Sequence, residues 1–232
     1  MRDKILFFVA GFFVGIAELL PGISGATVAL MFGVYKKIIS FINNFKGISL
    51  VFPFLVGMII GVFGFSQLVE FFFLNFRQWF DFIIGIVMIF YGTFLVLTNI
   101  SDKSIKNYLF NSFIFLIAVF VGSSLSQISG IEVQKTFLLL LVYGFIACSF
   151  LIIPGISGSA FLLAIGVYPE IIAAISNLNM EILFPFAIGM LTAIFIMPKV
   201  IYALFKQYES KILVTFGGFI FGAGFIFFSW LI

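Results

Sequence analysis

The stretch that decides the fold is ELLPGISGATVAL, residues 18–30, which places one carboxylate, a Pro-Gly pair and two hydroxyl side chains in an otherwise apolar segment. Proline removes a helical hydrogen bond and glycine weakens a helix, so the segment predicts a break between two helical arms. A break of this kind needs an explanation where the surroundings offer no water, because the freed backbone groups need partners.

The composition identifies those surroundings as a membrane. Of the 232 residues, 63% are hydrophobic and 9% are charged, whereas about a quarter of the residues in a soluble domain are charged. Long apolar runs recur along the whole chain and predict an all-α integral membrane protein with one polytopic domain, residues 1–232. The sequence has no His and one Cys, Cys148, which argues against metal sites and histidine chemistry, so no cofactor is expected. The net charge of +3 gives no reason to expect nucleic acid as a partner.

The opening motif occurs twice. PGISGATVALMFGVY (21–35) aligns with PGISGSAFLLAIGVY (154–168), with nine identities in fifteen positions. FPFLVGM (52–58) aligns with FPFAIGM (184–190) at nearly the same offset. The chain is therefore predicted to be a tandem duplication.

The duplication divides the domain into three parts. Repeat one covers residues 1–100, a linking transmembrane segment covers 101–133, and repeat two covers 134–232. Each repeat is expected to start with a re-entrant helical hairpin broken at PGISG, because the arm after the motif reaches only about 20 Å against a hydrocarbon core of about 30 Å.

About five full spans accompany the two hairpins in this prediction. Three of them, near 50–73, 81–99 and 107–124, lie between the hairpins, and an odd number of crossings inverts the second repeat. The hairpin topology places ten of the twelve Lys and Arg residues on one face and only Arg77 and Lys135 on the other. A broken spanning helix at each motif would divide them seven against five. Because Lys and Arg collect on the cytoplasmic side, we predict a multi-pass protein of the cytoplasmic membrane with its N-terminus in the cytoplasm.

Two breaks at corresponding positions of inverted halves predict a shared anion site near the membrane midplane. The glycines expose successive N–H groups, each following helix directs its positive dipole end into the site, and the hydroxyls add donors without charge. The alternative is that the Pro-Gly pairs are packing kinks and the hydroxyls bond to their own helices. The candidate substrate-binding residues are Pro21, Gly22, Ser24, Gly25, Thr27, Pro154, Gly155, Ser157, Gly158 and Ser159.

Glu18 breaks the internal symmetry, because its counterpart in the second repeat is Leu151. A carboxylate inside an apolar run is costly enough that a functional role is the first hypothesis. We expect Glu18 to couple transport to protons by binding and releasing one. The alternative is a structural hydrogen bond to backbone freed by the nearby Pro21.

With ELLPGISGAT and IPGISGS at matching positions of two halves, the whole chain resembles the PopT family of polyprenyl-phosphate transporters. It departs from the family pattern at Ala26, where Gly-Gly-Thr is expected. The resemblance implies a flippase that returns undecaprenyl phosphate, or a related lipid carrier, across the cytoplasmic membrane for reuse in cell-envelope synthesis. The partners implied are this lipid-linked phosphate, membrane lipids and a coupling proton or sodium ion, and a homo-oligomer is compatible with the sequence.

Two other classes stay open at this point. A transporter or channel for a small anion would use the same helix ends but would need a continuous wet path. An intramembrane enzyme or a scaffold is the second alternative, although an enzyme would need a base for Ser24 or Ser157 and the sequence has no His to supply one. We therefore predict a protein that is not an enzyme.

Overall fold

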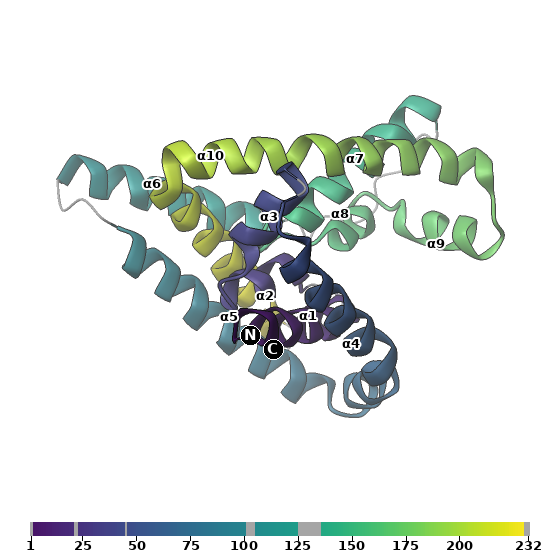
Figure 1. Ribbon diagram of the computed structural model, residues 1–232, viewed down its shortest axis with the longest axis horizontal. Helices are drawn as coiled ribbons and strands as arrows, with labels where there is room; N and C mark the ends of the chain where they lie inside the picture. The colour runs from purple at the N-terminus through teal and green to yellow at the C-terminus, as the bar shows by residue number, and fades with distance from the viewer. Residues whose placement is uncertain (1, 21–22, 45, 101–104, 125–135, 230–232) are drawn as a thin grey trace.

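The computed structural model describes residues 2–20, 23–44, 46–100, 105–124 and 136–229, and these ranges contain helices and no strand (Figure 1). The prediction of an all-α protein is thereby confirmed. The helices are α1 (Arg2–Glu18), α2 (Gly25–Met31), α3 (Tyr35–Asn44), α4 (Ile48–Asn75), α5 (Arg77–Asn99), α6 (Ile105–Ser124), α7 (Phe137–Ile152), α8 (Gly158–Ala164), α9 (Tyr168–Ser176) and α10 (Met180–Ser229).

Several of these helices have the length of a membrane span. Ile48–Val69 in α4, Arg77–Asn99 in α5 and Met180–Phe227 in α10 are long and apolar enough by length and composition, and the bent pair α2 and α3 is a fourth candidate. Helix α10 bends at Tyr208, which has φ −134° and ψ 38°, and its two parts are about 42 and 32 Å long. The three spans predicted near 50–73, 81–99 and 107–124 correspond in position to α4, α5 and α6, and the part Phe110–Ser123 of α6 is a shorter apolar helix. The count of five full spans stays a prediction.

Each PGISG motif is followed by a helix shorter than the predicted arm, and the re-entrant hairpin itself stays a prediction. Helices α2 and α8 have seven residues each and reach only about 10 Å. Two residues after its last helical residue, each helix is followed by a glycine in the left-handed region, Gly33 with φ +70° and Gly166 with φ +73°. Each glycine N–H donates to the carbonyl three residues before it, which is Leu30 in α2 and Leu163 in α8. After the first of these turns the chain changes direction by 115° into α3.

The two halves also repeat one helix crossing. A Cβ added to Gly11 of α1 would collide with the carbonyl of Phe54 in α4. A Cβ added to Gly144 of α7 would collide in the same way with the carbonyl of Phe186 in α10. These pairs correspond in the sequence alignment, so each half brings its first helix against its next long helix through small residues that let the backbones approach.

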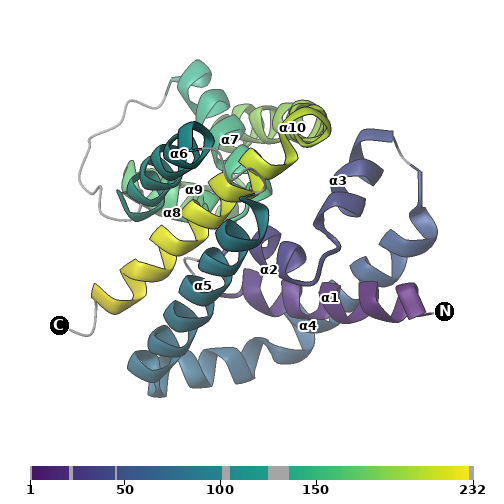
Figure 2. The same cartoon turned by 90° about the vertical axis from the view of Figure 1, so that its left-hand side faces the viewer.

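A second crossing joins the halves, where α5 runs beside the second part of α10 (Figures 1 and 2). A Cβ on Gly92 would lie 2.6 Å from the Gly217 carbonyl, and one on Gly224 would lie 3.1 Å from the Gly85 carbonyl. The alignment pairs Gly85 with Gly217 and Gly92 with Gly224, so the contact is reciprocal and the helices are antiparallel. Two halves related by a two-fold axis perpendicular to these helices would have this relation, and the inverted repeat itself stays a prediction.

The outer surface of the fold is rich in large apolar side chains. Phe63, Phe90 and Phe120 lie on three different helices and expose 79%, 73% and 71% of their area. Soluble monomers rarely expose extended apolar surface of this kind, whereas a bilayer covers it. The chain is accordingly a multi-pass membrane protein. The start of α1 and the end of α10 lie at opposite sides of the molecule in Figure 2.

Candidate functional site

The first broken turn connects α1 to α2. Ser24 precedes α2 as its N-cap with extended backbone (φ −97°, ψ 126°), but its side chain does not cap the helix. Its hydroxyl donates instead to the Leu151 carbonyl, with 3.5 Å between the oxygens. The first N–H of α2, at Gly25, donates to Oε1 of Glu18 at 3.0 Å. A carboxylate from the preceding helix therefore accepts from the first N–H of α2, where the positive end of the helix dipole favours negative charge.

The second broken turn connects α7 to α8 and is built differently. Gly155 has φ +86°, a conformation that favours glycine. Ser157 is the N-cap of α8 and accepts from the N–H of Ala160 at 3.4 Å. The hydroxyls of Ser157 and Ser159 lie 2.9 Å apart within hydrogen-bonding distance. This turn thus uses its own hydroxyls where the first turn uses Glu18.

The two turns contact each other directly. The buried N–H of Gly155 donates to Oγ1 of Thr27 at 2.8 Å, and Thr27 is only 1% exposed. The Ser24 hydroxyl also bonds to Leu151 of α7, the helix that leads into the second motif. Both hydrogen bonds connect residues that lie far apart in the sequence. The structure therefore brings together Ser24 and Thr27 of the first motif with Gly155 of the second.

The other predicted site residues lie around this contact. Pro154 and Gly158 are buried, and Ser157 and Ser159 are half-buried. Pro21 and Gly22 lie outside the described residues. The proposed role of the whole set in substrate binding stays a prediction.

Glu18 is the last residue of α1, and its side chain is exposed at the edge of a cavity of about 130 Å³. The cavity is also lined by Gly25 and Tyr35 and by apolar side chains of α1, α2, α3 and α4. The structural alternative for Glu18 is a hydrogen bond to backbone freed by Pro21. The structure does show a backbone hydrogen bond, in which the Glu18 carboxylate accepts from the N–H of Gly25. The coupling role of Glu18 stays a prediction.

Sequence reasoning missed one polar contact at the junction of the halves. Tyr35, the first residue of α3, is 3% exposed, and its hydroxyl donates to the Ile152 carbonyl at 3.0 Å. Because Ile152 ends α7, this bond joins the start of α3 in the first half to the end of α7 in the second. A signal was available, since Tyr35 and Tyr168 both close the fifteen-residue repeat.

This geometry defines a multi-pass α-helical membrane protein in which the turns at the two PGISG motifs contact each other, and paired helix breaks of this kind are found in secondary transporters. The chain belongs to the undecaprenyl phosphate translocase-like family, which it matches over residues 1–89 and 77–231. It is 25% identical to the polyprenyl-phosphate transporter of Vibrio cholerae serotype O1 over 235 aligned positions, which cover 93% of this chain and 74% of that protein. No solved structure matches the chain. The family indicated by the two PGISG motifs is therefore confirmed.

Proposed function

We propose that this protein translocates a polyprenyl phosphate, undecaprenyl phosphate or a similar lipid carrier, across the cytoplasmic membrane for reuse in cell-envelope synthesis. The observation that carries the proposal is the buried contact between the two turns, in which Gly155 donates to Thr27. A carrier that alternates between two faces needs a site made by both of its halves, and these residues come from both. Family membership and the name of the Vibrio relative support a lipid carrier as the substrate.

The phosphate is proposed to bind between the turns, by replacing bonds that the protein now makes to itself. The N–H of Gly25 is held by Glu18, and the N–H of Gly155 is held by Thr27. Two anions cannot share one amide without repulsion, so a phosphate that reaches Gly25 has to displace the Glu18 carboxylate. The described conformation is then the closed form of the site.

The polyprenyl tail is proposed to stay in apolar surroundings while the headgroup crosses. The cavity beside Glu18 has an apolar wall that includes Val14, Ile38 and Phe54. Such a wall suits the first isoprene units of a lipid, whereas a hydrated small anion would lose its water there without replacement. This observation favours a lipid carrier over the alternative, a transporter for a small anion.

The test is transport in proteoliposomes that contain the purified full-length protein. Wild type should move a labelled polyprenyl phosphate between leaflets, should not move the matching polyprenol, and should not accumulate inorganic phosphate. Thr27→Val should reduce the transport rate at least tenfold, while Thr93→Val, which removes a hydroxyl bonded only within α5, should not. Transport of inorganic phosphate without transport of the lipid would replace this proposal with the small-anion alternative.

A further inference from the structure

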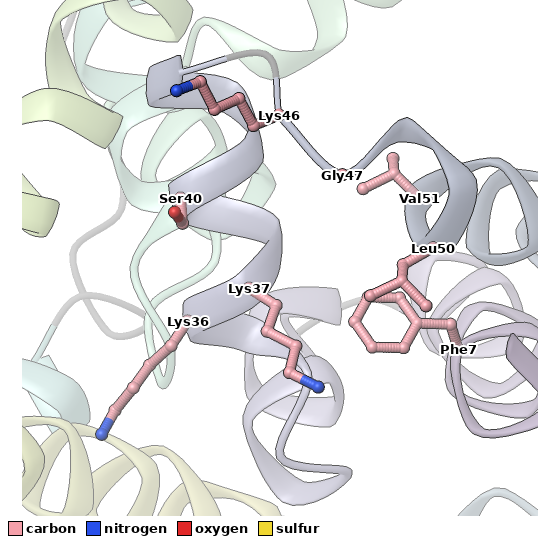
Figure 3. Close-up of a pocket in the computed structure, with 8 residues that line it drawn as sticks. All are labelled: Phe7, Lys36, Lys37, Ser40, Lys46, Gly47, Leu50 and Val51. Carbon is pink, nitrogen blue, oxygen red and sulfur yellow. The ribbon is translucent and has the colours of Figure 1, made fainter. Parts of the chain in front are cut away.

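A second cavity, of about 260 Å³, lies between α3 on one side and α1 and α4 on the other (Figure 3). Its two walls differ in chemistry. We call it the lysine cleft, and it is lined by Lys36, Lys37, Ser40, Lys46 and Gly47 on one side and by Phe7, Leu50 and Val51 on the other. One wall therefore supplies cations, and the facing wall is apolar.

Lys37 is the cation that enters the cleft. Figure 3 shows its ammonium group in the gap toward Phe7, whereas Lys36 extends away toward α10, where it pairs with Glu209. Lys37 Nζ lies 3.4 Å from Asp3 Oδ2, but both side chains are more than half exposed. An exposed pair of this kind contributes little, so an incoming anion can compete for Lys37 at small cost.

The lysine cleft adjoins the cavity beside Glu18. Helix α1 lines both, through Phe7 in the cleft and through Val14 and Glu18 in the other cavity. Phe7 and Glu18 are eleven residues apart on one helix, or about 16 Å along its axis. Helix α4 lines both as well, through Val51 and Phe54. The two cavities thus lie at successive depths along the same helices.

The second repeat lacks these cations. The alignment pairs Lys36 with Pro169 and Lys37 with Glu170. In the predicted inverted topology these positions lie on opposite faces of the membrane, so the cationic wall is a feature of the cytoplasmic face alone. A phosphate at that face would be attracted by Lys37.

We propose that the lysine cleft binds the phosphate headgroup of an isoprenoid lipid at the cytoplasmic face, with Lys37 as its cation and Leu50 and Val51 against the start of the tail. The proposal rests on the proposed function and names a second position for the same ligand, outside the hairpin turns. Ligand pockets for whole drug-sized molecules begin at about 300 Å³, so a cleft of 260 Å³ suits a headgroup and its nearest isoprene units.

The test is equilibrium binding of farnesyl phosphate to the detergent-purified full-length protein, with farnesol and inorganic phosphate as separate probes. Lys37→Gln should weaken farnesyl phosphate binding about tenfold, equivalent to about 1.4 kcal/mol, and Lys37→Arg should stay within about twofold of wild type. Lys199→Gln, an equal charge change on exposed surface of α10, should have no effect. Leu50→Gln should weaken farnesyl phosphate binding without changing that of inorganic phosphate.

Each contrary result has a separate meaning. Equal affinities for Lys37→Gln and Lys199→Gln would overturn the lysine cleft as a site, while wild-type transport in proteoliposomes would leave the proposed function standing. Binding of inorganic phosphate as tight as that of farnesyl phosphate would overturn the assignment to a lipid. Absence of both farnesyl phosphate binding and polyprenyl phosphate transport in wild type would overturn the proposed function itself.

Discussion

Replacing Gly155 with alanine tests whether the second turn is packed against α10 as tightly as the structure indicates. Two separate costs arise. An L-residue at φ +86° is strained, which costs about 1–2 kcal/mol. The new methyl group would also lie 2.5 Å from the backbone nitrogen of Ile220 and 2.6 Å from Cβ of Phe219. Backbone cannot rotate away as a flexible side chain can, so we add an overpacking cost of about 1–3 kcal/mol.

Gly33→Ala is the matched control, because Gly33 has φ +70° and open space around the position of the new methyl group. Gly33→Ala should therefore show the destabilisation caused by backbone strain alone. The apparent melting temperature of the detergent-purified protein should therefore fall in both variants. It should fall further for Gly155→Ala by about 6 °C, taking about 2 kcal/mol for the collision and about 3 °C per kcal/mol. Equal shifts in the two variants would refute the close packing of Gly155 on α10.

Three further predictions concern other contacts. Thr27→Val should lower the melting temperature more than Thr27→Ser, because valine leaves the buried N–H of Gly155 without its acceptor at a cost of about 1–3 kcal/mol; equal effects would show that the hydroxyl is dispensable. Gly92→Ala should destabilise the fold by pushing α5 from α10, whereas Gly64→Ala, whose methyl group would meet nothing closer than 3.9 Å, should not. In a Cys148→Ala background, the variants Lys206→Cys and Arg77→Cys should react with an impermeant maleimide from opposite sides of the membrane. Reaction of both variants from the same side would contradict the hairpin topology.

The sequence was sufficient for the helical architecture because the deciding signals are local. Apolar runs, Pro-Gly pairs and the duplicated GVY ending mark where helices begin and end, and α2 and α8 lie directly after the breaks that the motif predicted. The single α10 was not foreseen as one element. Residues near Tyr208 stay helical on both sides of the bend, and nothing in the run KQYES signals a loop with glycine or proline.

The sequence predicted which residues lie at the site, but it did not predict which of them form hydrogen bonds with each other. The motifs indicated that two turns meet, but hydrogen-bond partners depend on the rotation of α2 against α7, which local sequence does not encode. Thr27 therefore accepts from Gly155, whereas the sequence suggested donors aimed at a ligand. Tyr35 was missed for the same reason, because its partner is a backbone carbonyl 117 positions away.

A difference in charge between the two ends of the proposed transport path does not by itself give transport a direction. A binding site changes how strongly the lipid is held at one face, but it leaves the free energies of the lipid in the two leaflets unchanged. In the predicted topology Lys37 lies on one side of the membrane and Glu170 on the other, and in our proposal these residues set the half-saturating lipid concentration at each face without changing the final distribution. Direction requires coupling to a second gradient, and Glu18 is the group proposed to exchange the proton.

The two roles separate in one experiment. In proteoliposomes with an imposed pH gradient, wild type should drive the labelled polyprenyl phosphate to an unequal steady-state distribution between leaflets. Lys37→Gln should raise the half-saturating concentration and reach the same distribution, since the gradient still acts. Glu18→Gln can still accept from the Gly25 N–H through its amide oxygen, so the turn keeps its bond while proton exchange is lost. The steady state of this variant should be the same with and without the gradient. If it keeps the wild-type response to pH, Glu18 is a structural acceptor for α2 and the coupling group lies elsewhere in the chain.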